Sequence, residues 1–292
     1  MKTLVTAAGR RLGRAFTATG PGSGRIVGFD RSMLDITDED TVAKVLRRER
    51  PDVLVNAAAC TAVDRAESEP EAAHRMNVEA PGVLASACRK AGIRLVHIST
   101  DSVFDGEDNL PSTPDASTRP LSVHGATKLE GERLVLEMLP GALVLRTAWV
   151  CSAHGRNFMD TMLRPMRERG EVRMVRDQFG TPTFAGDLAE ANRGLVECDA
   201  VGVQHWTRSG TATRYDFAEA IRREGQNRNL LGTNARVLPI STEEFPTPAR
   251  RPRFSVLGCS QAYTMLGATA RHWRDALAET LAEIADVRSE FA

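Results

Sequence analysis

Short apolar runs alternate with helical segments through the first half of the chain, and this alternation constrains the fold more than any other feature. The runs lie at residues 4–6, 25–29, 52–56, 94–99 and 142–146. The run DVLVN at 52–56 is almost continuously apolar, which is typical of a strand in a parallel sheet covered on both faces. Helical spacing separates the runs at residues 12–18, 38–48 and 71–90. These repeated units predict an α/β fold with a Rossmann-type, doubly wound parallel sheet.

The alternation loosens after about residue 150. Short strand and helix patterns continue at 201–206, 215–223 and 273–284, and three prolines interrupt an arginine-rich loop at 246–252. We predict a Rossmann dinucleotide-binding-type domain at residues 1–150 and mainly a smaller C-terminal substrate lobe at 151–292, with segments that return to the sheet. Ligands of such sheets bind outside the carboxyl ends of the strands, so the lobe is expected to pack there.

Charge and cysteine content exclude several classes of partner. The 38 basic and 38 acidic residues give a formal net charge of zero, so a nucleic-acid partner is not expected. The five cysteines are dispersed without a C-x-x-C motif, which argues against a disulfide framework or a zinc site and for a reducing compartment. No apolar run reaches the ~18 residues of a membrane span, and no signal-peptide pattern opens the sequence. We expect a cytoplasmic protein with no membrane partner and no metal site.

The turn after the first predicted strand reads TAAGRRLG at residues 6–13, and its place before a helix is that of a phosphate-binding turn. The spacing G-x-x-G-x-x-G would put glycine at positions 7, 10 and 13, where the chain has Ala7, Arg10 and Gly13. A side chain at the middle position intrudes where the backbone would approach a pyrophosphate. Either this is a solvated turn with surface arginines, or an arginine contacts a phosphate. The candidate cofactor residues are Gly9, Arg10, Arg11, Leu12 and Gly13.

Two more strand ends supply candidate cofactor residues. Asp35 and Ile36 follow the second strand, where an acidic residue can contact an adenosine, whereas Asp38 is better placed as a helix cap. Small residues end the third strand, so that either a flat ligand lies against the backbone or a helix packs closely on the sheet. These candidates are Asn56, Ala57, Ala58 and Ala59.

Hydroxyl and titratable side chains follow the fourth strand. The segment STDSVFDG at 99–106 places Thr100 where its hydroxyl could bond a substrate carbonyl, although Ser, Thr and Asp also favour turns. His124 and Lys128 are four residues apart at the start of a predicted helix and therefore share a face. A proton donor beside a fixed ammonium is a plausible acid–base pair, although an isolated His-x-x-x-Lys is far more often structural.

Taken together, the motifs resemble those of the dTDP-4-dehydrorhamnose reductases, extended members of the short-chain dehydrogenase/reductase superfamily. The resemblance covers nearly the whole chain. It rests on LDITD at 34–38, NAAACTAVDRAESEP at 56–70, HISTDSVFDG at 97–106, HGATKLEGE at 124–132, LRTAWV at 145–150, DQFGTPT at 177–183 and PTPARRP at 246–252. It implies reduction of a 4-keto group on a nucleotide-linked 6-deoxyhexose with NADPH or NADH. The implied partner is a small molecule, a sugar nucleotide.

The resemblance also implies roles for individual residues. Thr100 would polarise the substrate carbonyl, and Lys128 would hold the cofactor ribose and tune the acid. Asp35 and residues 56–59 would line the cofactor. The substrate side would comprise Ser102, Val103, Trp149, Asn157, Gln178, Thr183 and Arg251.

The chain departs from the family pattern around this site. The family takes its proton from the Tyr of a Y-x-x-x-K pair, and His124 stands at that position here. One interpretation keeps the reductase, with His124 as a neutral N–H donor because the Lys128 ammonium lowers its pKa. The alternative is a reassigned scaffold that performs non-redox chemistry, such as elimination, epimerisation or cyclisation, or acts as a non-catalytic binding subunit. The retained Thr100 and Lys128 favour the reductase.

Overall fold

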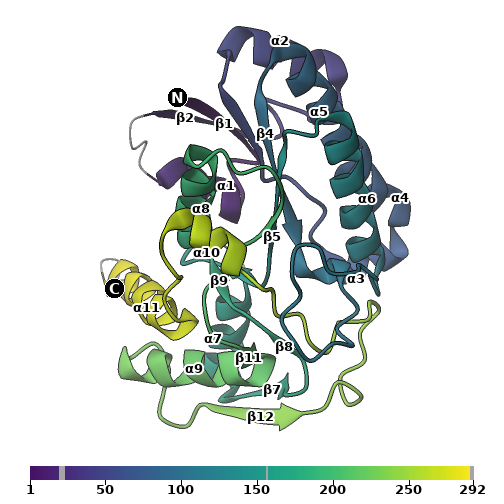
Figure 1. The fold of residues 1–292 in the computed structure, drawn as a ribbon. Coiled ribbons are helices and arrows are strands. Elements are labelled where there is room, and N and C mark those ends of the chain that lie inside the picture. The colour runs from purple at the N-terminus through teal and green to yellow at the C-terminus, as the bar shows by residue number, and fades with distance from the viewer. Residues whose placement is uncertain (20–23, 156, 290–292) are drawn as a thin grey trace.

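A six-stranded parallel sheet forms the centre of the computed structural model, which describes residues 1–19, 24–155 and 157–289 (Figure 1). The strands, in spatial order, are β2 (Arg25–Phe29), β1 (Lys2–Thr6), β3 (Val53–Asn56), β4 (Arg94–Thr100), β5 (Leu143–Thr147) and β10 (Gly202–His205). The chain passes from β1 to β2 on one side and then to β3 on the other. The strand order therefore reverses between β1 and β3, and ligands of such sheets bind at the carboxyl edge of this point. The predicted fold class is confirmed.

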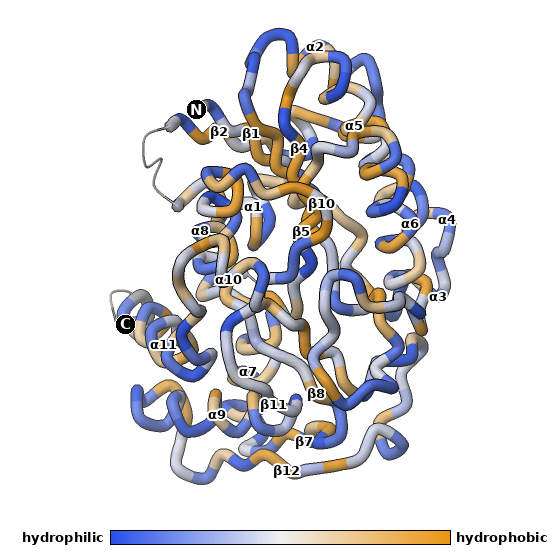
Figure 2. The backbone as a smooth tube through the Cα atoms, in the orientation of Figure 1, coloured by the Kyte–Doolittle hydropathy of each residue, from blue (hydrophilic) through white to orange (hydrophobic). Residues whose placement is uncertain are grey.

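Helices cover both faces of the sheet. On one face lie α2 (Glu39–Glu49), α5 (Ala80–Ala91) and α6 (Val123–Met138), and on the other α1 (Arg11–Ala18) and α8 (Ala185–Glu197). Leu4 and Val5 are neighbours in β1, yet they pack into the two separate cores because successive strand side chains point to opposite faces. Both side chains are fully buried, which explains why the strands have no polar face. Figure 2 shows these apolar strands in the interior.

The helix expected over residues 71–90 is divided. Helix α3 (Val63–Ser68) precedes α4 (Pro70–His74), a π-helical turn η1 (Arg75–Glu79) and then α5. Pro81 lies in the first turn of α5 and has no N–H to bond the carbonyl of Asn77 four residues earlier, which favours the wider turn. The Asn77 side chain instead accepts from Cys60 N at 2.9 Å and donates to Thr127 Oγ1 at 3.0 Å. The periodicity was correct, but the sequence did not reveal this wide turn.

The second half forms a smaller layer around its own core, below the sheet in Figure 1. Its elements are β6 (Val150–Cys151), α7 (Phe158–Arg169), β7 (Glu171–Val175), β8 (Phe179–Gly180), β9 (Thr183–Phe184), β11 (Ala212–Thr213), α9 (Arg214–Asn227), β12 (Arg236–Ile240) and α11 (Trp273–Ser289). Helix α10 (Ser260–Leu266) instead packs beside α8 and β10, in the core on one face of the sheet. Phe217 lies at the middle of this core, stacked on Phe158 at 5.1 Å and edge-on to Trp273 at 5.6 Å between ring centroids. Strand β10 and helix α8 belong to the sheet layers instead, and the boundary near residue 150 stays a prediction.

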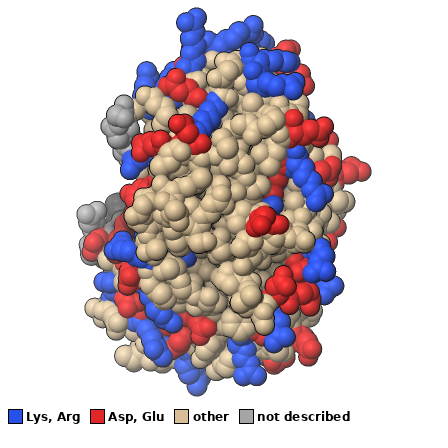
Figure 3. Space-filling model, viewed as in Figure 1, with Lys and Arg blue, Asp and Glu red and all other residues tan. Residues whose placement is uncertain are grey.

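Charged side chains lie mainly around the periphery of the face seen in Figure 3, whose centre carries few of them. Among the described residues, no helix is long and apolar enough to cross a membrane. The same residues contain no cluster of three or more His, Cys, Asp or Glu side chains that could hold a metal ion.

Candidate active site

Helix α6 brings the predicted acid–base residues to the carboxyl edge of β4. Its first turn packs against the short 3-10 helix η2 (Asp101–Val103) so closely that a Cβ on Gly125 would lie 2.1 Å from the Ser102 carbonyl oxygen. One turn further along α6, Lys128 Nζ donates to the Ile98 carbonyl of β4 at 2.8 Å. The strand end that holds Thr100 and the helix face that holds His124 and Lys128 are therefore clamped together.

His124 is buried and electrically neutral in this site. Burial, the positive charge of Lys128 and that of Arg251 lower its pKa to about 4, partly opposed by a hydrogen bond to the Cys60 carbonyl. Burial is the largest cause, whereas the sequence had suggested Lys128. The Nδ1 atom lies 2.9 Å from the Cys60 carbonyl oxygen, which can only accept, so Nδ1 carries the proton.

This tautomer corrects the expected role of His124. A neutral imidazole has one N–H, and here that N–H is bonded to Cys60. The remaining Nε2 is a lone pair, so it can accept a hydrogen bond or remove a proton but cannot donate one. The prediction that neutral His124 offers an N–H to the substrate is therefore wrong, because the local backbone already binds that proton. Only the imidazolium form can act as an acid.

A buried hydrogen-bond chain runs from β1 to Lys128. Thr6 Oγ1 donates to Asn56 Oδ1 at 2.9 Å, and Asn56 Nδ2 donates to His97 Nδ1 at 3.1 Å. His97 Nδ1 is thus an acceptor, so the proton of this neutral ring lies on Nε2, 3.0 Å from Lys128 Nζ. An amine accepts that proton only in its uncharged form. Burial lowers the pKa of Lys128 to about 8, with the negative charge of Glu132 opposing, and burial holds the pKa of His97 well below its ordinary value.

Thr100 lies at the end of β4 with its hydroxyl held locally. Its Oγ1 donates to Asp101 Oδ1 at 2.9 Å, lies 3.2 Å from Ser102 Oγ and accepts from the Ser102 N–H at 3.1 Å. Burial raises the pKa of Asp101, against hydrogen bonds from Ser255 and Thr100. To polarise a substrate carbonyl, the Thr100 hydroxyl must turn away from Asp101. Of its neighbours, Ser102 is half-buried, whereas Val103 is fully buried in a small apolar cluster.

The turn between β1 and α1 has the shape of a dinucleotide turn with one strained residue. Ala7 adopts φ of 53°, a left-handed conformation that favours glycine. Gly13 is required, because a Cβ there would lie 2.2 Å from the Ala7 carbonyl oxygen. Gly9 and Arg10 are exposed, and no side chain caps the first turn of α1. The open helix start suits a phosphate, so the turn fits a dinucleotide, with Ala7 and Arg10 as the two departures.

The other predicted cofactor residues divide into accessible and internal groups. Asp35 is half-buried, and its Oδ1 accepts from the N–H and hydroxyl of Thr37, which lower its pKa. Ile36 belongs to the core, as Leu12 partly does. The side chain of Asn56 is fully buried in the chain described above, while the following small residues are half-buried at the carboxyl edge. These are Ala57, Ala58 and Ala59.

On the predicted substrate side, three residues support the backbone. Asn157 caps α7, accepting from Met159 N at 2.9 Å. Thr183 is fully buried in β9, and Gln178 Nε2 donates to Thr242 Oγ1 at 3.1 Å. These contacts show what the side chains do in the fold, and their roles toward a substrate stay predictions.

Trp149, Arg251 and Arg11 have a more direct place at the site. Trp149 is half-buried with φ of 47°, a strained conformation for a bulky residue. Arg251 forms an ion pair with Asp64 at 2.9 Å. Arg11 donates from Nη1 to the Val150 carbonyl at 3.2 Å, which joins α1 to the segment after β5. The site therefore draws on the sheet and on the C-terminal half.

The sequence missed three residues that the structure brings to the site. His97 had a signal, since it is a polar residue inside the apolar run RLVHIS. Asn77 holds both backbone groups of Cys60, and Arg214 stacks on Trp149, with 3.6 Å between the guanidinium carbon and the ring centroid. Neither lies in a recognisable motif, and both meet their partners only after folding.

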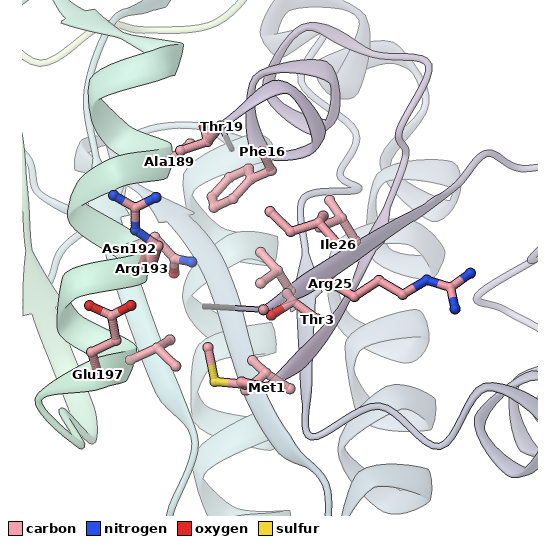
Figure 4. Close-up of a pocket in the computed structure, with 15 residues that line it drawn as sticks. Met1, Thr3, Phe16, Thr19, Arg25, Ile26, Ala189, Asn192, Arg193 and Glu197 are labelled. Carbon is pink, nitrogen blue, oxygen red and sulfur yellow. The ribbon is translucent and has the colours of Figure 1, made fainter. Parts of the chain in front are cut away.

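A separate hollow lies between α1 and α8, toward the amino ends of β1, β2 and β3 (Figure 4). Apolar side chains such as Phe16 and Val55 line it, with the buried amide of Asn192. It faces the strand ends opposite to those that carry Thr100. The hollow is therefore not part of the candidate active site.

Because its buried histidines are neutral, the folded protein should become less stable as pH falls. The pKa values of His124 and His205 are lowered to about 4 and about 3, chiefly by burial, whereas in the unfolded chain both titrate near 6.5. Below pH 6.5 the unfolded chain binds the extra protons, so stability falls as pH falls, by up to about 1.4 kcal/mol per pH unit for each histidine. Urea unfolding at pH 7.5 and 5.5 measures this. His205→Gln should reduce the pH dependence, whereas exposed His154→Gln should leave it unchanged.

Comparison with known proteins agrees with this architecture. The sequence matches the family described as the RmlD substrate binding domain over residues 1–286. A dTDP-4-dehydrorhamnose reductase of Burkholderia thailandensis is 39% identical over 290 residues, which cover 95% of this chain and 97% of the relative. A dTDP-4-keto-6-deoxy-D-glucose reductase of Streptomyces niveus is 41% identical over 280 residues, covering 94% and 95%.

Solved structures show the same fold. A dTDP-4-dehydrorhamnose reductase from Clostridium acetobutylicum superposes with a TM-score of 0.91 at 36% identity, covering 97% of this chain and 99% of that one. The enzyme of that name from Bacillus anthracis, in complex with NADP, gives 0.90 at 32% identity with the same coverage. The chain therefore belongs to the RmlD substrate-binding-domain family, as its resemblance to the dTDP-4-dehydrorhamnose reductases predicted.

Proposed function

We propose that this protein reduces a keto group on a nucleotide-linked deoxysugar with NADPH or NADH. The observation that carries the proposal is the placement of Thr100, His124 and Lys128 at one carboxyl strand edge, clamped by the Gly125 contact and the Lys128–Ile98 hydrogen bond. The reductases at 36–41% identity and the NADP-bound relative support the substrate class and the cofactor.

The residues that would hold the dinucleotide come from three strand ends. The open first turn of α1 would take the diphosphate, Asp35 an adenosine hydroxyl, and the small residues 57–59 the flat surface of the cofactor. The nicotinamide, when bound, supplies the hydride. In its uncharged form, Lys128 accepts from His97 Nε2 and donates one N–H to the Ile98 carbonyl, which leaves one N–H, and we assign that donor to the ribose.

As the carbonyl carbon of the ketone gains the hydride, the chain must supply a proton to the ketone oxygen. Thr100 polarises the carbonyl by a hydrogen bond once its hydroxyl leaves Asp101. His124 supplies the proton from Nε2 as imidazolium, since its neutral form has no N–H there. With its pKa at about 4, that form is scarce at neutral pH, so we expect slow turnover that rises as pH falls.

The test is a titration of the purified protein with NADPH and NADH, followed by reduction of dTDP-4-dehydrorhamnose monitored through loss of the reduced cofactor. Micromolar binding and turnover of the sugar nucleotide support the proposal. Dinucleotide binding without turnover of any keto sugar nucleotide contradicts the assigned reaction. No dinucleotide binding up to millimolar concentration contradicts both the cofactor and the reaction.

Ala7→Gly should stabilise the chain and tighten NADPH binding. A left-handed conformation costs a non-glycine residue about 1–2 kcal/mol, against about 0.5–1 kcal/mol for the extra chain entropy of glycine. Position 7 is the tight-turn glycine of the dinucleotide pattern, so relief of the strain there should also favour the turn geometry that binds the pyrophosphate. The neighbouring Ala8→Gly, which has no positive φ to relieve, is the matched control and should only destabilise. Equal effects of both changes on urea unfolding would contradict the strain at Ala7.

A further inference from the structure

Arg214 is held at the site by aromatic rings. It is the first residue of α9, and its guanidinium carbon lies 3.6 Å from the ring centroid of Trp149 and 5.4 Å from that of Phe158. A guanidinium over an aromatic face is attracted by the ring quadrupole, and stacking fixes the plane of its five N–H donors. Trp149 keeps a strained backbone in this arrangement, with φ of 47°.

The charge of Arg214 has no carboxylate partner. Over residues 1–19, 24–155 and 157–289, no acidic oxygen lies within 4.0 Å of its nitrogens, and its guanidinium makes no hydrogen bond. The buried Arg146 and Arg208 differ, because each forms an ion pair, with Glu132 at 2.7 Å and with Asp187. The half-buried guanidinium of Arg214 is thus free to bind an anion.

Its surroundings are unfavourable for a cation with a purely structural role. A positive charge at the first residue of a helix faces the positive end of the helix dipole. Burial lowers the pKa of Arg214 to about 10, and the positive charge of Arg251 lowers it further, against the negative charge of Asp101. The rings offset part of this cost, and a bound anion would offset the rest.

Arg214 lies beside the residues assigned to the reaction. It acts on the pKa of Asp101, the neighbour of Thr100, while Arg251 acts on both Arg214 and His124. The charge of Arg251 is already balanced by Asp64 at 2.9 Å. A diphosphate that enters this region brings two negative charges, and Arg214 is the cation beside Arg251 that has no ion pair within 4.0 Å among the described residues.

We propose that Arg214, oriented by Trp149, is an oxyanion subsite that binds the diphosphate of the sugar nucleotide. The proposal rests on the proposed function. The same chemistry occurs in the diphosphate of the dinucleotide, but Arg214 belongs to α9 and the lobe core, whereas the open start of α1 serves the dinucleotide. Arg11 instead belongs to α1 and donates to the Val150 carbonyl at 3.2 Å.

The experiment compares Arg214→Met with the intact chain by calorimetric titration of dTDP, thymidine and NADPH. Methionine keeps an unbranched apolar chain against Trp149 but removes the charge and the donors. We expect dTDP binding to weaken at least ~10-fold, with a smaller dependence on salt, while thymidine and NADPH bind as before. Arg214→Lys should give an intermediate loss, since the charge remains without the planar fork. Arg223→Met, an exposed change on the same helix, is the control for net charge.

The other possible results of the titrations contradict the proposed subsite in different ways. Equal dTDP binding by the intact chain and by Arg214→Met overturns the subsite and leaves the proposed reaction standing. If dTDP and thymidine both bind more weakly to the same extent, Arg214 only shapes the pocket. If only NADPH binds more weakly, the subsite belongs to the cofactor. Either result overturns the proposal. If the intact chain binds NADPH but neither dTDP nor UDP, the sugar-nucleotide function itself fails, and the subsite fails with it.

Discussion

Lys128→Met should lower kcat/KM for keto-sugar reduction by about 10²-fold, because loss of the donor to the cofactor ribose misplaces the nicotinamide. The Nζ atom is fixed by the Ile98 carbonyl at 2.8 Å and by His97 at 3.0 Å. Methionine is similar in volume, so the buried space stays filled, but nothing then donates to the cofactor ribose. The measurement is steady-state reduction at saturating NADPH, with a parallel NADPH titration.

The variant must be separated from a misfolded chain. Loss of Nζ leaves the Ile98 carbonyl and the His97 N–H without partners, which costs about 1–3 kcal/mol for each buried group. Urea unfolding should show this loss while the chain remains folded in buffer. Lys44→Met, on the exposed surface of α2, is the control and should change neither property. Turnover close to that of the intact chain would remove Lys128 from the proposed mechanism.

The fold could be predicted because its signals are local. The run DVLVN became β3, residues 25–29 became β2 with the predicted bounds, and Asp38 caps α2 by accepting from Asp40 N and Thr41 N. Each signal involves residues within a few positions of one another. The division of the 71–90 helix was not predicted: Pro81 is a local signal for the wide turn, whereas the contacts of Asn77 with Cys60 and Thr127 that accompany it form only on folding.

The grouping of the candidate residues on one helix face could also be predicted, but their protonation could not. The sequence placed His124 and Lys128 on one helix face, and the structure keeps them there. Which nitrogen of His124 carries the proton depends on the Cys60 carbonyl, 64 residues away in the sequence. Likewise, the stacking of Arg214 on Trp149 joins two segments that no motif connects. Tautomers and unpaired charges arise from tertiary contacts, so residue types alone do not specify them.

The tautomer of His124 gives the reaction a characteristic pH dependence. The acid form of a group with a pKa of about 4 falls tenfold for each pH unit above that value, to about one molecule in a thousand at pH 7. Turnover limited by this form should therefore rise about tenfold per unit as pH falls from 8 to 5. The neutral form, with its Nε2 lone pair, suits removal of a proton from a hydroxyl and is almost fully populated above about pH 5. Oxidation of the corresponding alcohol should therefore be nearly independent of pH in this range.

His124→Tyr should remove this pH dependence and raise turnover at least ~10-fold at pH 8. A phenol titrates near 10, so it keeps its proton across the whole range and can donate it to the ketone oxygen. His124→Phe, which fills similar space without a donor, gives the rate with no acid at this position.

If the intact chain has a flat pH profile and the same turnover as His124→Phe, the proton comes from elsewhere. Thr100 backed by Asp101, 2.9 Å from its hydroxyl, is then the source to test, and Asp101→Asn should abolish reduction. A steep profile in the intact chain that is lost in both variants instead assigns the proton to His124 imidazolium, since of the three side chains compared at this position only histidine gains a charge as pH falls.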